Sequence, residues 1–263
     1  MKSKAEKHSP LKDKPLRYAG QSIDEQIENL RDKALFYVLY PAFILLYIVM
    51  QWMNTIFLPS KSSISISPYI GDVIFWGIIA YCVYKIFQIF NEIKRLAMAR
   101  DGEKIVAEGL QELIKQDAAI LNDIRGDKFN IDHVVISPHG IYLIETKTYS
   151  KPAKKDTTIS FDDENVYVNG RVVDRKPINQ AKALSKWLQE LLQKSTGEKF
   201  FIQPVILFPG WFVESMKRGQ EVWILNPKAL STFIGNEPVR LKETDVHLVT
   251  FHLSRYIRTY EAK

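Results

Sequence analysis

The sequence predicts an α/β domain with a mixed central sheet, preceded by a transmembrane helical hairpin. Three observations carry this prediction: two long apolar runs within residues 34–90, a hairpin pattern at 131–147, and an α-β-β-β-α-β order of periodic segments in the C-terminal part. Helices that alternate with strands favour a domain with a central sheet. We expect a disordered basic tail at 1–20, a helical membrane region at 21–100 and the α/β domain at 101–263.

Charge is distributed unevenly along the chain. The whole sequence holds 36 basic and 30 acidic residues, a formal net charge of +6. Residues 1–100 hold 13 basic and 8 acidic residues, whereas residues 101–263 hold 23 and 22. The basic excess therefore belongs mainly to the N-terminal part and is not a nucleic-acid footprint of the C-terminal domain. Cys82 is the only cysteine, which excludes a disulfide framework and a cysteine-based zinc site.

The two apolar runs are long enough to be membrane spans. The first, residues 34–58, contains no charged residue and includes Pro41, which membrane helices tolerate. The second, residues 69–90, carries Asp72 near one end and Lys85 near the other, where charged groups reach the interface. A bilayer core needs about 20 apolar residues as helix. We therefore predict two transmembrane helices, led by a short amphipathic helix that begins near residue 22 with a capping-box pattern.

Basic residues flank both spans on the same side. Arg31 and Lys33 precede the first span and three basic residues within 94–100 follow the second, whereas the connecting loop at 59–68 has only Lys61. The positive-inside rule then places the loop outside and both termini in the cytoplasm. The expected location is the inner (cytoplasmic) membrane. The alternative is a buried helical hairpin of a soluble protein, and a cleaved signal peptide fits less well because the first run starts too late and is too long.

The C-terminal part reads as helices and strands in alternation. Asp101 and Gly102 are expected to end the helix of the second span, so that a new helix starts with Glu103 in its first turn. Further elements are predicted as a strand at 118–124, hairpins at 131–147 and 166–173 (the second through an Asn-Gly type I′ turn), a helix at 178–194 opened by a proline, strands at 200–208 and 221–225, a short helix at 227–234 and a last strand at 246–253.

The hairpin at 131–147 contains the candidate site. Residues 137–140, Ser-Pro-His-Gly, suit a type I turn, and if the two ends of that turn pair, Asp132 lies directly opposite Glu145. Like charges so placed destabilise the hairpin unless something offsets them, and a divalent cation would do so. Lys147 lies two residues beyond Glu145 and therefore shares its strand face. Two carboxylates and a lysine on one face indicate a metal-and-water site.

The order of these residues resembles the PD-(D/E)xK nuclease superfamily, and more closely the nuclease-related domain (NERD) family. The resemblance covers about residues 102–210 and implies a restriction-endonuclease-like αβββαβ core. The chain departs from the family pattern at Lys176, which stands where the family has Asn before a proline. The matching pieces are Gly102-Glu103, Ile131-Asp132-His133, residues 140–147 with Glu145 and Lys147, and Pro177-Ile178-Asn179-Gln180-Ala181.

The resemblance implies which residues hold a metal ion. Asp132, Glu145 and the carbonyl of Thr146 would bind Mg²⁺ or Mn²⁺, hard cations that prefer oxygen ligands. Glu103 would complete the shell, directly or through water. In the simplest structural alternative, Glu103 is only an acid favoured by the dipole at a helix start.

The resemblance also implies roles for a lysine and a glutamine. Lys147 would orient and help deprotonate the attacking water and stabilise charge on the scissile phosphate, and Gln180 would position the phosphate or the water. The alternatives are a cross-strand ion pair of Asp132 with Lys147 and an exposed Gln180. His133 and His139 are expected to be structural. We expect Tyr142, Trp211 and Trp223 in the core, and the lysines of 151–155 either on phosphates or in solvent.

Two functions of different classes follow. The first is a membrane-anchored, metal-dependent nuclease that hydrolyses phosphodiester bonds of nucleic acid, DNA before RNA, at the cytoplasmic face. The alternative is a catalytically inactive, membrane-tethered module that binds or senses nucleic acid, although the near-neutral domain makes strong nonspecific binding less expected. The expected partners are nucleic acid and a membrane, and a homo-oligomer formed through the spans is a third, weaker option.

Overall fold

The computed structural model describes residues 15–57, 68–151, 158–162, 164–172, 176–214 and 220–260. By its contacts the chain divides into two units: residues 23–98 form one, and the segment before residue 23 forms the other together with residues 99–263. Most of the predicted basic tail, most of the loop between the spans, and Lys154 and Lys155 lie outside the described residues.

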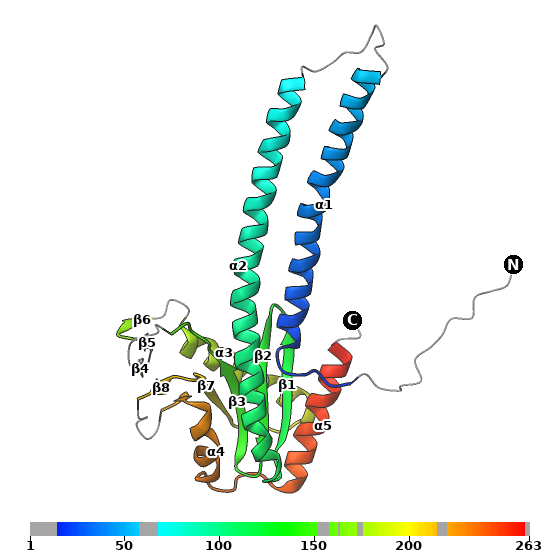
Figure 1. Ribbon diagram of the computed structural model, residues 1–263. Helices are drawn as coiled ribbons and strands as arrows, with labels where there is room; N and C mark the ends of the chain where they lie inside the picture. The colour runs from blue at the N-terminus through cyan, green and yellow to red at the C-terminus, as the bar shows by residue number, and fades with distance from the viewer. Residues whose placement is uncertain are drawn as a thin grey trace, which may run out of the picture. The chain divides into compact units, whose positions relative to one another are not determined.

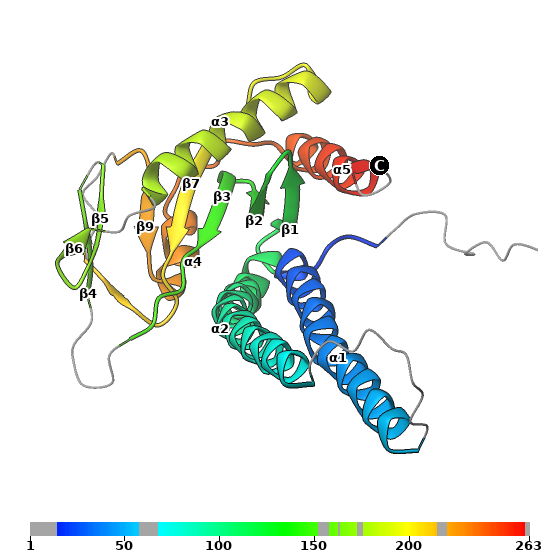
Figure 2. The same cartoon turned by 90° about the horizontal axis from the view of Figure 1, so that it is seen from above.

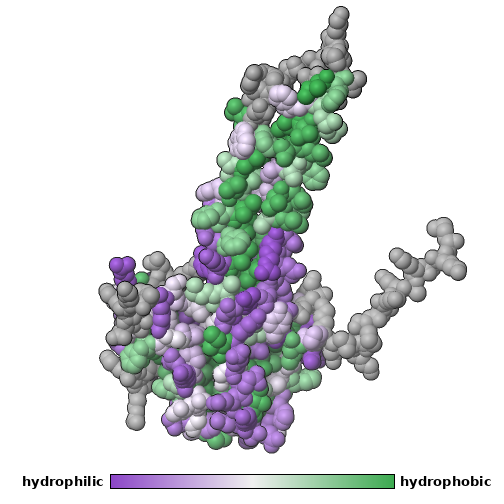
Figure 3. Space-filling view, viewed as in Figure 1, coloured by the Kyte–Doolittle hydropathy of each residue, from purple (hydrophilic) through white to green (hydrophobic). Residues whose placement is uncertain are grey.

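Two long helices account for both apolar runs (Figure 1). Helix α1 comprises Gln21–Phe57 and continues through Pro41, and helix α2 comprises Pro68–Ile114. Both are long and apolar enough to cross a membrane by length and composition. Their large apolar side chains are mostly exposed, for example Phe36 at 71 % and Trp76 at 66 %, and hydrophobic residues cover the hairpin in Figure 3. A buried hairpin of a soluble protein would instead hide such side chains inside a core.

The expected helix break at Asp101-Gly102 is wrong, because α2 continues without interruption to Ile114. Gly102 has a packing role instead: a β-carbon added there would lie 2.1 Å from the Thr148 side chain. Glycine thus lets α2 approach the segment that follows the β-hairpin at 131–147. Glu103 is therefore an interior helix residue, and a helix-start dipole does not explain it.

The C-terminal unit is built on a five-stranded mixed sheet with the order β1-β2-β3-β7-β9. Strand β2 is antiparallel to both of its neighbours, β1 and β3, whereas β3, β7 and β9 run parallel. The predicted α/β class and mixed sheet are confirmed, and the predicted strands at 200–208 and 221–225 are shorter than expected. The strands are β1 (Ala119–Gly126), β2 (Phe129–Ser137), β3 (Gly140–Thr146), β7 (Ile202–Leu207) and β9 (Trp223–Leu225).

Helices cover both faces of this sheet. On one face lie α3 (Pro177–Thr196) and α5 (Glu243–Tyr260), and Figure 2 shows these two helices on the same side of the strands. Their buried leucines and valines pack against apolar side chains of β1, β2 and β3. The other face is covered by the last turns of α2 and by α4 (Pro227–Gly235). Burial of these apolar surfaces is the main favourable term that holds the layers together.

The predicted last strand at 246–253 is wrong, because this segment lies inside α5. Its β-branched residues suggest a strand, but the buried positions are Val246, Val249, Leu253 and Ile257. Spacings of three and four residues place these side chains on one helical face. Packing of that face against the sheet outweighs the local propensity.

A second, four-stranded sheet has the order β6-β5-β4-β8. The predicted hairpin at 166–173 is present: Asn169 and Gly170 have φ values of 52° and 76°, as a type I′ turn requires. Strands β4 and β8 pair in parallel, and β8 has no counterpart in the sequence-based prediction. The strands are β4 (Thr158–Phe161), β5 (Val166–Val168), β6 (Arg171–Val172) and β8 (Phe212–Val213).

Candidate active site

The β2–β3 hairpin has the register predicted from its turn. Ser137 pairs with Gly140 and His133 pairs with Ile144. The same register, continued by one residue, sets Asp132 opposite Glu145. The backbone N–H of Thr146 donates a 2.7 Å hydrogen bond to Asp132 Oδ2, which fixes this carboxylate beside the end of β3.

Glu145, Lys147 and Gln180 form a closed polar triangle. Lys147 Nζ lies 3.0 Å from Glu145 Oε2 and 3.2 Å from Gln180 Oε1. Gln180 Nε2 in turn donates a 3.0 Å hydrogen bond to Glu145 Oε2. Gln180 comes from the first turn of α3, which opens with Pro177 at its first position. The ion pair of Lys147 is therefore with Glu145, two residues before it on the same segment, and Gln180 is part of the site.

Three carboxylates of this region are buried: Glu103 is 5 % exposed, Asp132 8 % and Glu145 2 %. Burial, the charge of Asp123 and the charge of Glu145 raise the pKa of Glu103 to about 7. Burial and the charges of Glu145 and Glu103 also hold the pKa of Asp132 well above its ordinary value. Such mutual effects show that the acids act on one another.

Burial also raises the pKa of Glu145, although Lys147 acts in the opposite direction. For Lys147, burial alone would lower the pKa, but the nearby charges of Glu145 and Asp132 outweigh it and raise the pKa above its ordinary value. Lys147 is therefore a protonated ammonium at neutral pH in the protein alone. The Lys147 ammonium therefore offsets part of the negative charge that Asp132 and Glu145 bring together on the β2–β3 hairpin.

Several buried oxygens of the site have no hydrogen-bond partner among the described residues: Glu103 Oε2, Glu145 Oε1 and Thr146 Oγ1. Unpaired buried polar atoms are costly, and oxygens of this kind suit a hard cation. Within the described ranges, no three side chains of His, Cys, Asp or Glu form a ready-made metal cluster. The unpaired oxygens of Glu103 and Glu145 are the side-chain atoms that would be available to a cation bound here.

Residues 99–209 match the family model of the nuclease-related domain. The chain carries a nuclease-related domain. Every predicted site residue lies inside the matched range, from Glu103 to Gln180, and the family resemblance of the sequence is confirmed. Searches among curated proteins and among solved structures each found no match.

The two histidines and the three aromatic residues singled out in the sequence have structural surroundings, as expected. His133 is fully buried with Nδ1 2.9 Å from Asn122 Oδ1, and burial lowers its pKa to about 4, so the ring is neutral. His139 Nδ1 lies 2.5 Å from the Glu237 carbonyl oxygen. Lys151 Nζ lies 5.2 Å from the centre of the Trp211 ring, a cation–π distance. Tyr142, Trp211 and Trp223 are buried.

Sequence reasoning missed one acid of the nuclease-related domain, Asp123. It is fully buried in β1 with a φ of 52°, and the β1–β2 register on either side places it opposite Asp132. The signal was the pair Asn122-Asp123 directly after the apolar residues 118–121. The sequence does not show the partner of Asp123, because that partner is Arg17, more than 100 positions away.

Mn²⁺ binding by the nuclease-related domain is expected to strengthen as pH rises from about 6 to about 8, across the raised pKa of Glu103. Below about pH 7 this carboxyl holds a proton, which it must lose to serve a cation. Titration of the full-length protein with Mn²⁺ at several pH values measures this. Affinity that is flat across this range contradicts the assignment.

The stability of the metal-free protein is expected to change in the opposite direction. The folded-state pKa of Glu103 lies above its ordinary value of 4.5, so the folded state holds the proton more tightly than the unfolded state. The contribution of Glu103 to stability is then present below pH 4.5 and is lost as pH rises to about 7. Urea unfolding of the metal-free protein over that window supplies the complementary measurement.

Proposed function

We propose that the protein is a membrane-anchored, metal-dependent nuclease that hydrolyses phosphodiester bonds of nucleic acid at the cytoplasmic face. DNA is the favoured substrate over RNA. The observation that carries this proposal is the buried Glu145 carboxylate, which binds Lys147 and Gln180 through Oε2 and leaves Oε1 unpartnered among the described residues. A cation, an ammonium group and an amide around one carboxylate suit hydrolysis of an anionic diester.

Each residue has a distinct part in the proposed reaction. Asp132, Glu145 and the Thr146 carbonyl would hold Mg²⁺ or Mn²⁺, with Glu103 direct or through water, and the bound ion supplies Lewis acidity to the phosphate and to water. The charged ammonium of Lys147 stabilises negative charge on the scissile phosphate. Its raised pKa favours this electrostatic role over proton abstraction.

Gln180 supports both partners of the triangle. Its amide donates to Glu145 and accepts from Lys147, so it holds the carboxylate and the ammonium at hydrogen-bonding distance. Because Gln180 is anchored on α3 while the other two lie at the end of β3, the helix and the strand together fix the geometry. Preorganisation of this kind is what makes charged groups effective in catalysis.

A nuclease assay on the full-length protein in detergent tests the proposal. Plasmid DNA and a single-stranded RNA are incubated with the protein and Mg²⁺ or Mn²⁺, with and without EDTA. We expect cleavage that needs the metal ion, with DNA cleaved faster than RNA. Absence of cleavage of either substrate overturns the nuclease assignment, and salt-dependent binding without turnover favours the inactive binding module in its place.

Membrane anchoring by α1 and α2 is part of the same proposal. The exposed apolar side chains of both helices are those a bilayer covers, and the flanking charges favour cytoplasmic termini. We expect the full-length protein to stay in the membrane fraction through a carbonate wash and to be released by detergent. Release by carbonate alone would show that neither helix is integrally inserted.

A further inference from the structure

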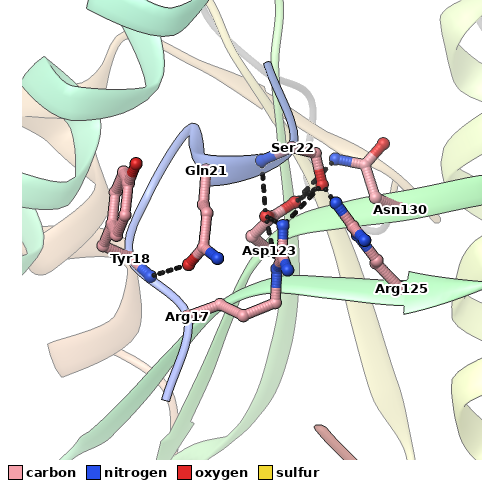
Figure 4. Close-up of polar contacts among 7 residues, drawn as sticks. All are labelled: Arg17, Tyr18, Gln21, Ser22, Asp123, Arg125 and Asn130. Carbon is pink, nitrogen blue, oxygen red and sulfur yellow. Dashed lines mark hydrogen bonds and ion pairs between the residues drawn. The ribbon is translucent and has the colours of Figure 1, made fainter. Parts of the chain in front are cut away.

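A buried polar cluster surrounds Asp123 and joins the start of α1 to strand β1 (Figure 4). Arg17 Nε and Nη2 each lie 2.7 Å from Asp123 Oδ2, and the two side chains are 2 % and 0 % exposed. Ser22 donates to the same carboxylate twice, from its backbone N–H at 2.8 Å and from Oγ at 2.6 Å. Asn130 Nδ2 adds a bond of 3.1 Å, and Arg125 Nε donates to Ser22 Oγ.

The same N-terminal segment contacts the candidate site. Burial is the largest effect on the Glu103 carboxyl and raises its pKa, and the backbone N–H of Gly20 acts in the opposite direction. Gly20 has a φ of 78°, and a β-carbon there would lie 3.0 Å from Arg100 Cγ, so glycine allows the close approach to α2. Arg100 and Glu103 are three residues apart and share a helix face. The segment therefore lies along the part of α2 that carries Glu103.

Arg17 supplies a positive charge beside a group of buried acids. The β1–β2 register on either side of Asp123 places it opposite Asp132, and the continued β2–β3 register places Asp132 opposite Glu145. Three acids thus lie in a row across three strands, and Arg17 pairs with the outermost one. A buried carboxylate is tolerated when it is paired and hydrogen-bonded. Arg17 thus pairs with an acid whose charge also acts on Glu103.

We propose that residues Arg17–Ser22, a segment that we call the clasp, position Glu103 for cation binding. The clasp lies outside the family match at 99–209, and the Arg17–Asp123 pair is the contact that holds it in place. The inference deepens the proposed function and rests on it. Arg17 and Gly20 are positioning residues, because they act through Glu103. Groups that orient a metal ligand typically change metal affinity about 10- to 100-fold when altered.

The test measures Mn²⁺ binding to full-length protein in detergent micelles from the electron paramagnetic resonance signal of free Mn²⁺. The double variant Arg17→Ala/Asp123→Asn removes this pair without changing the net charge, and Asn tolerates the positive φ. We expect its dissociation constant for Mn²⁺ to rise about tenfold. In a Glu103→Ala background the same double change should shift the constant by less than about twofold, since the clasp acts only through Glu103.

A matched control uses another Arg–acid pair of the same unit. Arg240 Nη2 lies 2.7 Å from Glu237 Oε2, and the variant Arg240→Ala/Glu237→Gln should leave Mn²⁺ binding unchanged. Arg17→Lys serves if the double variant does not fold: it keeps the charge but loses the two-pronged contact, so it should weaken binding by a smaller factor, again only when Glu103 is present.

Each outcome has a separate meaning. Wild-type protein that binds no Mn²⁺ overturns the metal site and the clasp with it. Wild-type binding that is unchanged in Arg17→Ala/Asp123→Asn overturns the clasp alone and leaves the proposed nuclease standing. Equal weakening with and without Glu103 also overturns the clasp, because it shows that the segment only stabilises the fold.

Discussion

Replacement of Glu145 by alanine is expected to lower the rate of DNA cleavage about 10³-fold, the scale of losing one preorganised electrostatic group. The side chain is 2 % exposed and is the common partner of Lys147 and Gln180. Its removal takes away a candidate cation ligand and leaves both partners without their shared acceptor. Initial rates on supercoiled plasmid with saturating Mn²⁺ measure the effect.

Two further variants make the Glu145 result specific. Glu145→Gln keeps the shape and the hydrogen-bonding capacity but removes the charge, and it should also lose most of the rate. Glu221→Ala removes a carboxylate that is paired with Lys182 on the surface and is 77 % exposed, and it should cleave like wild type. A folded Glu145→Ala protein that cleaves within tenfold of wild type would exclude Glu145 from the reaction.

Replacement of Lys147 by alanine is expected to lower the cleavage rate by about 10²- to 10³-fold, the scale of losing one preorganised electrostatic group. Unlike Glu145, Lys147 is not a candidate ligand, so Mn²⁺ binding should be retained or strengthened when its positive charge is removed. Paired measurements of cleavage rate and Mn²⁺ affinity on one protein preparation therefore separate the two residues. Loss of metal binding together with rate would assign Lys147 a structural role.

Lys147→Arg provides the control for shape. It preserves the charge, but the planar guanidinium differs from a compact ammonium in the bonds that it offers. The present contacts, 3.0 Å to Glu145 and 3.2 Å to Gln180, are made by one nitrogen atom. We expect the arginine variant to recover little of the lost rate, and full recovery would show that charge alone is sufficient.

The β2–β3 hairpin shows how far the sequence can predict the site. Its register depends on a four-residue turn and on period-two alternation, which are local, so the positions of Asp132, Glu145 and Lys147 relative to one another were predictable. The contact of Gln180 with Glu145 spans 35 positions and follows only from the packing of α3 on the sheet. The family resemblance supplied that residue, and the spacing along the chain did not.

The predictions of secondary structure that are wrong also failed because packing between distant segments, and not the local pattern, decides the structure. At Asp101-Gly102 the local pattern suggests a helix end, but tertiary packing uses the glycine for close approach to Thr148. In α5, β-branched residues suggest a strand, while burial of Val246, Val249 and Leu253 against the sheet selects a helix. Local propensity is a weak guide wherever packing decides. Arg17 was placed in a basic tail because its partner lies in a distant strand.

The Arg17–Asp123 pair makes the nuclease-related domain discontinuous along the chain. The hairpin of α1 and α2 is, in this sense, an insertion between the clasp and the rest of the fold, since Gly20 lies beside Arg100. A fragment cut at the boundary of the family match would leave the buried Asp123 without its Arg17 counter-ion, at a cost of about 3–5 kcal/mol. A soluble form of the domain is better made by replacing the hairpin with a short linker that keeps Arg17, Gly20 and Ser22.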